Sequence, residues 1–147
     1  MKLIVFEGLG FGLPYLQASY IEMQLLPALK GVTTQVYSWM QNPDLTPTPG
    51  QKQVIVGHSF GAAKICGANY SADLIVTIDP RWTGFDSFTA GSNAKKWVNY
   101  YERNLLFNLP GCPVNGADNT LLTDYHTQIC GDPVIAKFLN AWIGANL

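Results

Sequence analysis

The chain has 147 residues, of which 48% are apolar and 13% are charged, and its formal net charge is −1. This length predicts one domain over residues 1–147, without a cap domain. The near-neutral charge excludes the basic surface expected of a nucleic-acid binder, and the apolar content excludes intrinsic disorder. No apolar run approaches the length of a membrane-spanning helix, so we expect no transmembrane segment.

The first six residues, MKLIVF, are apolar but the run stops at Glu7. Because this is too short for the core of a signal peptide, the segment is expected to be a strand, and the expected localisation is cytoplasmic. Three cysteines are too few for a disulfide scaffold, so free thiols are expected. A bridge between Cys112 and Cys130 stays open as the alternative.

Strand and helix patterns alternate along the chain. Strands are predicted over Lys2–Phe6, Val32–Trp39, Gln53–Gly57, Asp73–Ile78 and Lys96–Tyr101, and helices over 14–30, 60–69 and 133–145. Residues 81–95 and 104–128 are expected to be irregular. Since the strands are continuously apolar and alternate with helices, we expect an α/β fold with a mostly parallel sheet of about five strands and helices on both faces.

The sharpest motif is Gly57-His58-Ser59-Phe60-Gly61, a G-x-S-x-G pattern between an apolar strand and a helix. The serine of such a turn sits where the chain reverses so sharply that side chains two residues away on either side would collide. Glycine at both positions removes that collision. The pattern therefore predicts a nucleophilic Ser59 at the start of a helix.

A serine hydroxyl needs a general base, and the chain has two histidines. His58 adjoins Ser59, and neighbouring side chains on such a turn point apart, so His126 is the expected base. Asp79 ends the strand after the motif and is the expected acid, because its side chain would emerge at the same sheet edge as Ser59. Three other carboxylates remain rivals for that role: Glu102, Asp118 and Asp124.

Two backbone N–H groups are needed to hold an oxyanion. One is expected from Phe60, and the other from Leu9 or Gly10 in the glycine-rich turn after the first strand. Aromatic side chains in loops at this edge are candidates for substrate binding: Phe11, Tyr15, Trp82 and Phe85. No metal site and no cofactor are expected, because metal-ligand spacings and a complete phosphate-binding motif are absent from the sequence.

These residues resemble the α/β-hydrolase superfamily, in its small lipase, esterase and cutinase-like members. The resemblance rests on the Gly57–Gly61 elbow, the Gly8–Gly12 turn, Asp79 and His126. It implies the strand order 2-1-3-4-5, with the site at the switch point between the first and third strands. The chain departs from the family in size, since about five strands are expected in place of the usual eight.

The predicted function is a serine hydrolase that cleaves carboxylic esters through Ser59, His126 and Asp79, with a small ester or a lipid-like molecule as substrate. A thioesterase, an amidase or a cell-envelope or cutinase-like esterase on the same triad is the first alternative. The second is a binding protein that keeps the scaffold without turnover. The oligomeric state stays open.

Overall fold

The computed structural model describes residues 1–8, 31–82, 87–104 and 111–147. Its centre is a six-stranded, entirely parallel sheet with the order β2-β1-β3-β4-β6-β8. The strands are β1 (Lys2–Glu7), β2 (Thr33–Ser38), β3 (Gln53–His58), β4 (Leu74–Ile78), β6 (Trp97–Glu102) and β8 (Asp118–Leu122). The expected α/β class and parallel sheet are thus confirmed.

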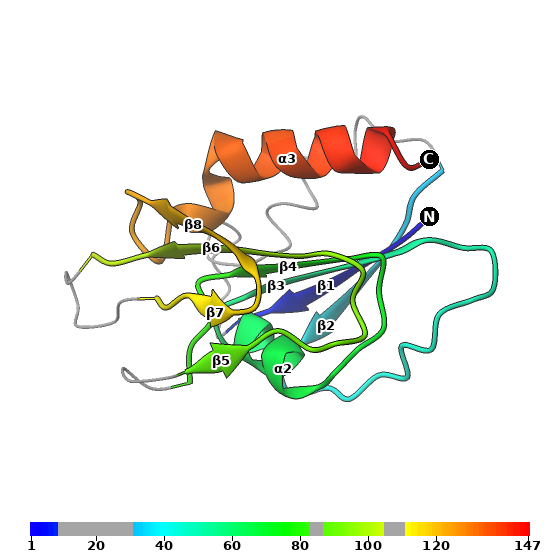
Figure 1. The fold of residues 1–147 in the computed structure, drawn as a ribbon, viewed down its shortest axis with the longest axis horizontal. Coiled ribbons are helices and arrows are strands. Elements are labelled where there is room, and N and C mark those ends of the chain that lie inside the picture. The colour runs from blue at the N-terminus through cyan, green and yellow to red at the C-terminus, as the bar shows by residue number, and fades with distance from the viewer. Residues whose placement is uncertain (9–30, 83–86, 105–110) are drawn as a thin grey trace.

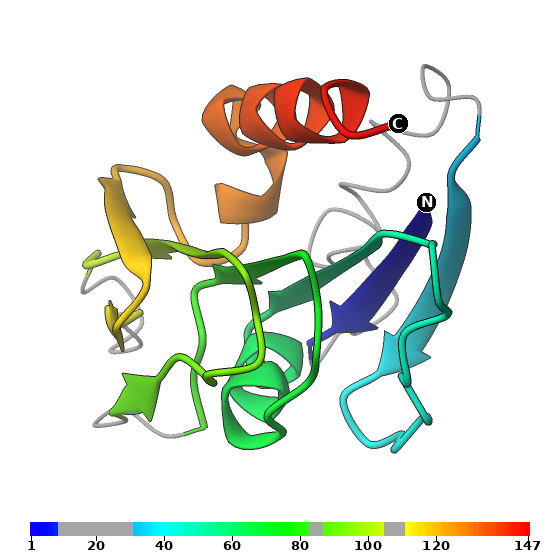
Figure 2. The same cartoon turned by 45° about the vertical axis from the view of Figure 1, so that its right-hand side comes forward.

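Helices cover both faces of the sheet (Figures 1 and 2). Helix α3 (Pro133–Gly144) lies on one face, where Ile135, Leu139 and Ile143 pack on alternate residues of the strands. Helix α2 (Phe60–Gly67) lies on the other face, together with the short parallel pair β5 (Phe88–Thr89) and β7 (Val114–Asn115). Because both faces are covered, β3 and β4 are buried along their whole length, as their apolar sequences predict.

The expected strand count was too low. Residues 104–128 contain β7 and β8, which sequence patterns assigned to a loop, and β5 lies in the segment 81–95. The five strands predicted from the sequence, β1, β2, β3, β4 and β6, keep the expected order. Strand β8 adds a sixth beside β6. Asn119 holds this edge: its Oδ1 accepts hydrogen bonds from Val114 N at 2.8 Å and from Asn99 Nδ2 at 2.9 Å. Hydrogen bonds of Asn119 with the buried Asn99 and with Val114, not apolar alternation, fix β8.

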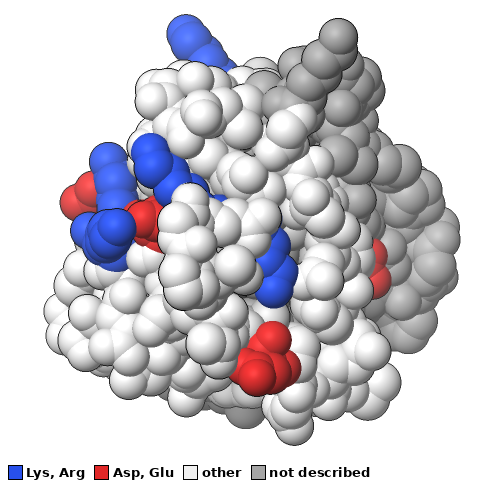
Figure 3. All heavy atoms as spheres, turned by 90° about the vertical axis from the view of Figure 1, so that its right-hand side faces the viewer, with Lys and Arg blue, Asp and Glu red and all other residues white. Residues whose placement is uncertain are grey.

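All six strands run in one direction, so their carboxyl ends share one edge of the sheet. The chain enters β2 from the end of β1 and later returns to β3 on the other side of β1, which makes the gap between β1 and β3 the switch point. Among the described residues, no helix is long and apolar enough to cross a membrane. Figure 3, which faces the side of the molecule carrying the termini, shows few charged groups on a largely uncharged surface.

Candidate active site

Ser59 lies between β3 and α2 with φ 55° and ψ −121°, a conformation that side chains strongly disfavour. The surrounding glycines allow it. A Cβ at Gly57 would come within 2.4 Å of Ile65 Cδ1, and a Cβ at Gly61 within 2.4 Å of Phe6 O. Helix α2 can therefore start directly against β1 and β3. The sharp turn predicted from the G-x-S-x-G pattern is present.

His126 and Asp79 continue a hydrogen-bonded chain from Ser59. His126 Nε2 lies 3.1 Å from Ser59 Oγ, and His126 Nδ1 is in hydrogen-bond contact with Asp79 Oδ2. The carboxylate can only accept, so Nδ1 carries the proton and Nε2 is free to accept the serine proton. This arrangement can deprotonate the hydroxyl and stabilise the imidazolium that forms.

Asp79 is held rigidly although its backbone is left-handed, with φ 51°. Its N–H donates to Tyr100 O at 2.7 Å, and its Oδ1 accepts from Glu102 N at 3.3 Å. Its side chain is fully buried. Gly111 closes the other side, because a Cβ there would lie 1.4 Å from Asp79 Oδ1. The carboxylate is thus fixed by the ends of β4 and β6 together with one glycine.

None of the three rival carboxylates is hydrogen-bonded to a ring nitrogen of His126 in the part of the chain that the structure describes. Glu102 is buried, but its carboxylate faces the Arg81 guanidinium and makes no hydrogen bond to the His126 ring. The Asp118 side chain is 76% exposed on β8, at the amino edge of the sheet. Asp124 interacts with Asp132 at the start of α3, which raises the pKa of Asp124 to about 6.

Arg81 is the charged neighbour that the sequence patterns did not single out. Its Nη2 donates to Asp79 Oδ2 at 2.9 Å and lies 3.6 Å from Glu102 Oε1. Burial raises the pKa of Glu102, and the Asn104 N–H that donates to its carboxylate opposes this effect. Arg81 lies two residues after Asp79, at the same end of β4, and this proximity was the sequence signal that could have identified it.

Ligating atoms of Asp79, Glu102 and His126 lie within 4.8 Å of one another, which raises the question of a metal site. The Arg81 guanidinium is in contact with both carboxylates and supplies the positive charge that an ion would bring. The cluster is therefore an ion-pair network.

His58, the other histidine of the chain, packs against His126. The His58 ring lies 4.7 Å from that of His126, centroid to centroid, at an interplanar angle of 30°, and His58 Nε2 lies 3.2 Å from His126 O. The two rings pack against each other at the end of β3, and only that of His58 is buried. Sequence reasoning assigned no role to His58 beyond its exclusion as a base, and the structure gives it one in positioning the His126 loop.

Phe60 follows Ser59 and opens α2, so its N–H has no acceptor within the helix. Gly8 directly follows β1 and lies against Ser59, since a Cβ there would lie 2.8 Å from Ser59 Cβ. The glycine-rich segment thus starts beside Ser59. The expected oxyanion donors Leu9 and Gly10 lie outside the described residues, as do Phe11, Tyr15 and Phe85.

Trp82 belongs to a group of three aromatic rings that includes Phe60, the residue after Ser59. Ring centroids of Trp39 and Phe60 are 5.3 Å apart, those of Phe60 and Trp82 5.5 Å, and those of Trp39 and Trp82 5.9 Å. They follow β2, β3 and β4 and so stand at the carboxyl edge. Trp82 is 43% exposed. We call Trp39, Phe60 and Trp82 the aromatic wall.

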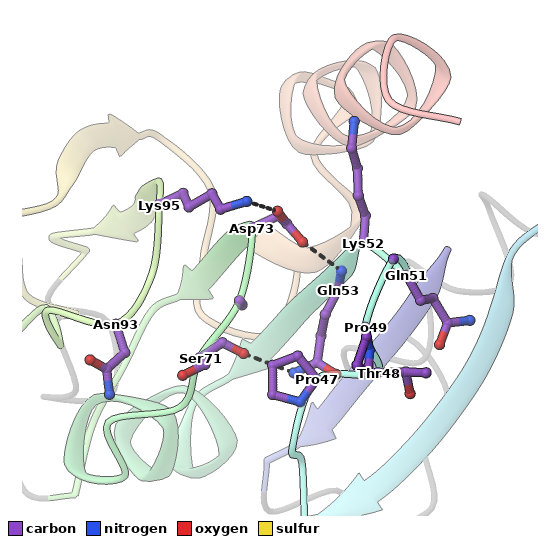
Figure 4. A pocket seen from close by; sticks show the side chains of 12 residues that line it. Pro47, Thr48, Pro49, Gln51, Lys52, Gln53, Ser71, Asp73, Asn93 and Lys95 are labelled. Atoms are coloured by element: carbon purple, nitrogen blue, oxygen red, sulfur yellow. Dashed lines mark hydrogen bonds and ion pairs between the residues drawn. The ribbon is translucent and has the colours of Figure 1, made fainter.

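A groove of about 430 Å³ opens at the opposite edge of the sheet (Figure 4). Gln53, the first residue of β3, and Asp73, directly before β4, line it with Lys95. Ser59 and Asp79 follow the other ends of these same strands. A six-residue strand is roughly 20 Å long, so the groove is separate from the candidate active site.

A scan against protein-family models and a search of curated proteins found no match to this chain.

Proposed function

We propose that this chain is a serine hydrolase that cleaves carboxylic esters, built as a minimal member of the α/β-hydrolase superfamily. The observation that carries the proposal is the continuous hydrogen-bonded chain from Ser59 Oγ through His126 to a fully buried Asp79. Its position at the switch point of a parallel sheet, where ligands of such sheets bind, supports it independently.

In the proposed reaction, Ser59 Oγ attacks the ester carbonyl while His126 Nε2 takes its proton. Asp79 stabilises the resulting imidazolium, and the Phe60 N–H donates to the oxyanion. His126 then protonates the departing alcohol, leaving an acyl group on Ser59. A water molecule, deprotonated by His126, attacks this acyl-enzyme and releases the acid. No step requires a cofactor.

The aromatic wall supports an uncharged, apolar acyl group as the substrate portion next to Ser59. Its rings offer apolar surface at the edge where the carbonyl would bind, and Trp82 keeps part of its ring accessible. The ion pairs of Arg81 are turned toward buried carboxylates rather than toward this surface. A small or lipid-like ester fits these properties better than an anionic substrate.

The direct test is covalent labelling by a fluorophosphonate, followed by mass mapping of the adduct. The proposal expects one label on Ser59, no label on Ser59→Ala, and slow labelling of His126→Ala. A folded wild-type protein that stays unlabelled would instead favour a binding protein on this scaffold. A parallel panel of esters, thioesters and amides with matched acyl groups separates the esterase from the other acyl chemistries.

The identity of the acid is tested by a matched pair of substitutions. Asp79→Asn is expected to lower kcat on the order of 10³-fold to 10⁴-fold, because the amide no longer enforces the productive tautomer of His126. Asp118→Asn changes the same charge on an exposed strand and should leave kcat unchanged. Equal effects of the two substitutions would contradict the assignment of Asp79.

A further inference from the structure

Asp79 of the candidate triad belongs to a buried group of three charged side chains, and the other two, Arg81 and Glu102, have no part in the proposed ester cleavage. Asp79, Arg81 and Glu102 are all at most 5% exposed. Arg81 Nη2 contacts both carboxylates, at 2.9 Å and 3.6 Å. Two carboxylates and one guanidinium leave the group with one net negative charge.

This arrangement is costly as a stabilising device. Buried ion pairs return little of the free energy lost when their charges leave water. Arg81 Nε and Nη1 are also buried without a hydrogen-bond partner in the part of the chain that the structure describes. Each such donor destabilises the native state. A group that is kept despite this cost is expected to serve the site beside it.

Arg81 has two opposing effects on the site. Its hydrogen bond fixes Asp79 Oδ2, the oxygen that also accepts from His126 Nδ1. The same guanidinium, however, draws on the carboxylate charge that a protonated His126 needs. Glu102 offsets this effect, because its carboxylate faces the guanidinium and lies within 4.8 Å of a ring nitrogen of His126.

We propose that Arg81 and Glu102 are positioning residues for the Asp79–His126 pair. Arg81 anchors the Asp79 carboxylate, and Glu102 balances the guanidinium so that the buried group keeps the negative charge that stabilises a protonated His126. The inference rests on His126 acting as the base in the proposed function. It adds an electrostatic support to the triad, supplied by the end of β6.

The backbone supports this role for Glu102. Its carboxylate accepts from Asn104 N, and its own N–H donates to Asp79 Oδ1. One residue thus orients the acid through its main chain and balances its neighbour through its side chain. Five described groups face or adjoin the Asp79–His126 pair and contribute to the pH dependence of His126 protonation. They are His58, Asp79 itself, Arg81, Glu102 and the buried Cys130. The Asp124–Asp132 pair adjoins the same loop.

The test follows the His126 ring by NMR as a function of pH. The chain has only two histidines, so the ring signal that disappears in His126→Ala is that of His126. Glu102→Gln removes one negative charge without changing shape, so the His126 signal should titrate at a lower pH by about one unit. The double variant Arg81→Met/Glu102→Gln restores one net negative charge, so the titration should return toward the wild-type position.

Ester hydrolysis gives a second readout that a purely structural role would not move. The acidic limb of the kcat/KM profile should shift to lower pH in Glu102→Gln and return to its wild-type position in the double variant. The kcat of the double variant should be below that of the wild type, because Asp79 has lost the hydrogen bond from Arg81. Asp118→Asn should change neither readout.

An unchanged titration of His126 in folded Glu102→Gln would overturn the inference, as would a double variant shifted as far as the single one. Both results are independent of ester turnover. Failure of the proposed function would instead appear as an unlabelled Ser59, while the NMR titration would still report whether Glu102 supports His126.

Discussion

Gly111 lies directly against Asp79, with no room for a side chain between them: a Cβ on Gly111 would come within 1.4 Å of Asp79 Oδ1. These residues are 32 positions apart in the sequence, yet the glycine forms one wall of the carboxylate site. The contact makes Gly111 a specific target for testing the geometry around His126.

Gly111→Ala is expected to displace the Asp79 carboxylate and so lower kcat at least 10²-fold, since small misplacements in an active site are costly. Gly67→Ala is the matched control, because nothing lies within 4 Å of a Cβ at the end of α2. That substitution should keep activity and stabilise the helix by up to about 1 kcal/mol. Steady-state kinetics and thermal unfolding measure both effects, and a fully active Gly111→Ala would contradict the described site.

The aromatic wall predicts a preference for apolar acyl groups. Trp82→Ala should raise KM for esters with aromatic or medium-length acyl chains by about tenfold, since aromatic contacts contribute about 0.5–1.5 kcal/mol beyond area burial. Acetyl esters, which cannot reach the ring, should be little affected. Val134→Ala, which removes an exposed side chain from α3, serves as the control. A uniform change across acyl lengths would argue against a binding role for the wall.

The Asp124–Asp132 pair predicts a pH-dependent stability. Hydrogen bonding to Asp132 is the main cause that raises the pKa of Asp124 to about 6, and burial adds to it. The native state therefore favours protonated Asp124, and this contribution is complete below the usual carboxyl range and is lost as pH rises through 6. Asp124→Asn, which replaces the carboxyl O–H donor by an uncharged amide N–H donor, should stabilise the protein by up to about 1 kcal/mol at pH 8.

Urea unfolding of Asp124→Asn and of the wild type at several pH values measures this difference, which should vanish below about pH 4. Asp44→Asn provides a control of opposite sign, because the side-chain hydrogen bond from Thr46 lowers the pKa of Asp44. Its effect should be a loss of stability at neutral pH that disappears in acid. A pH-independent difference for Asp124→Asn would contradict the carboxyl pair.

Two of the three cysteines are predicted to react slowly in the native protein. Burial is the main cause that raises the pKa of Cys66 to about 12 and that of Cys130 well above its usual range. Since the thiolate is the reactive species, Cys66 and Cys130 should resist alkylation at about pH 8 in the native protein and react in denaturant. Mass mapping after a timed iodoacetamide pulse locates the labels; rapid native labelling of either residue would contradict this burial.

Sequence patterns predict the central strands well because β3 and β4 are continuously apolar. They predict the sharp turn at Ser59 because a side chain at either flanking glycine would collide with its neighbours. They fail at β8, whose polar sequence DNTLL has the composition of a loop and is held by the hydrogen bonds of Asn119. They also pass over Arg81, because its role depends on Glu102, 21 residues further along the chain. Such a role follows from which strands are neighbours, and no local pattern encodes that.

The left-handed backbone of Ser59 has a consequence for protein engineering. That conformation costs about 1–3 kcal/mol for a residue with a side chain and much less for glycine. Ser59→Gly should therefore fold more stably while losing the nucleophile. A library of variants screened only for thermal tolerance would enrich this substitution and discard the proposed chemistry, so any such screen needs a concurrent selection for turnover.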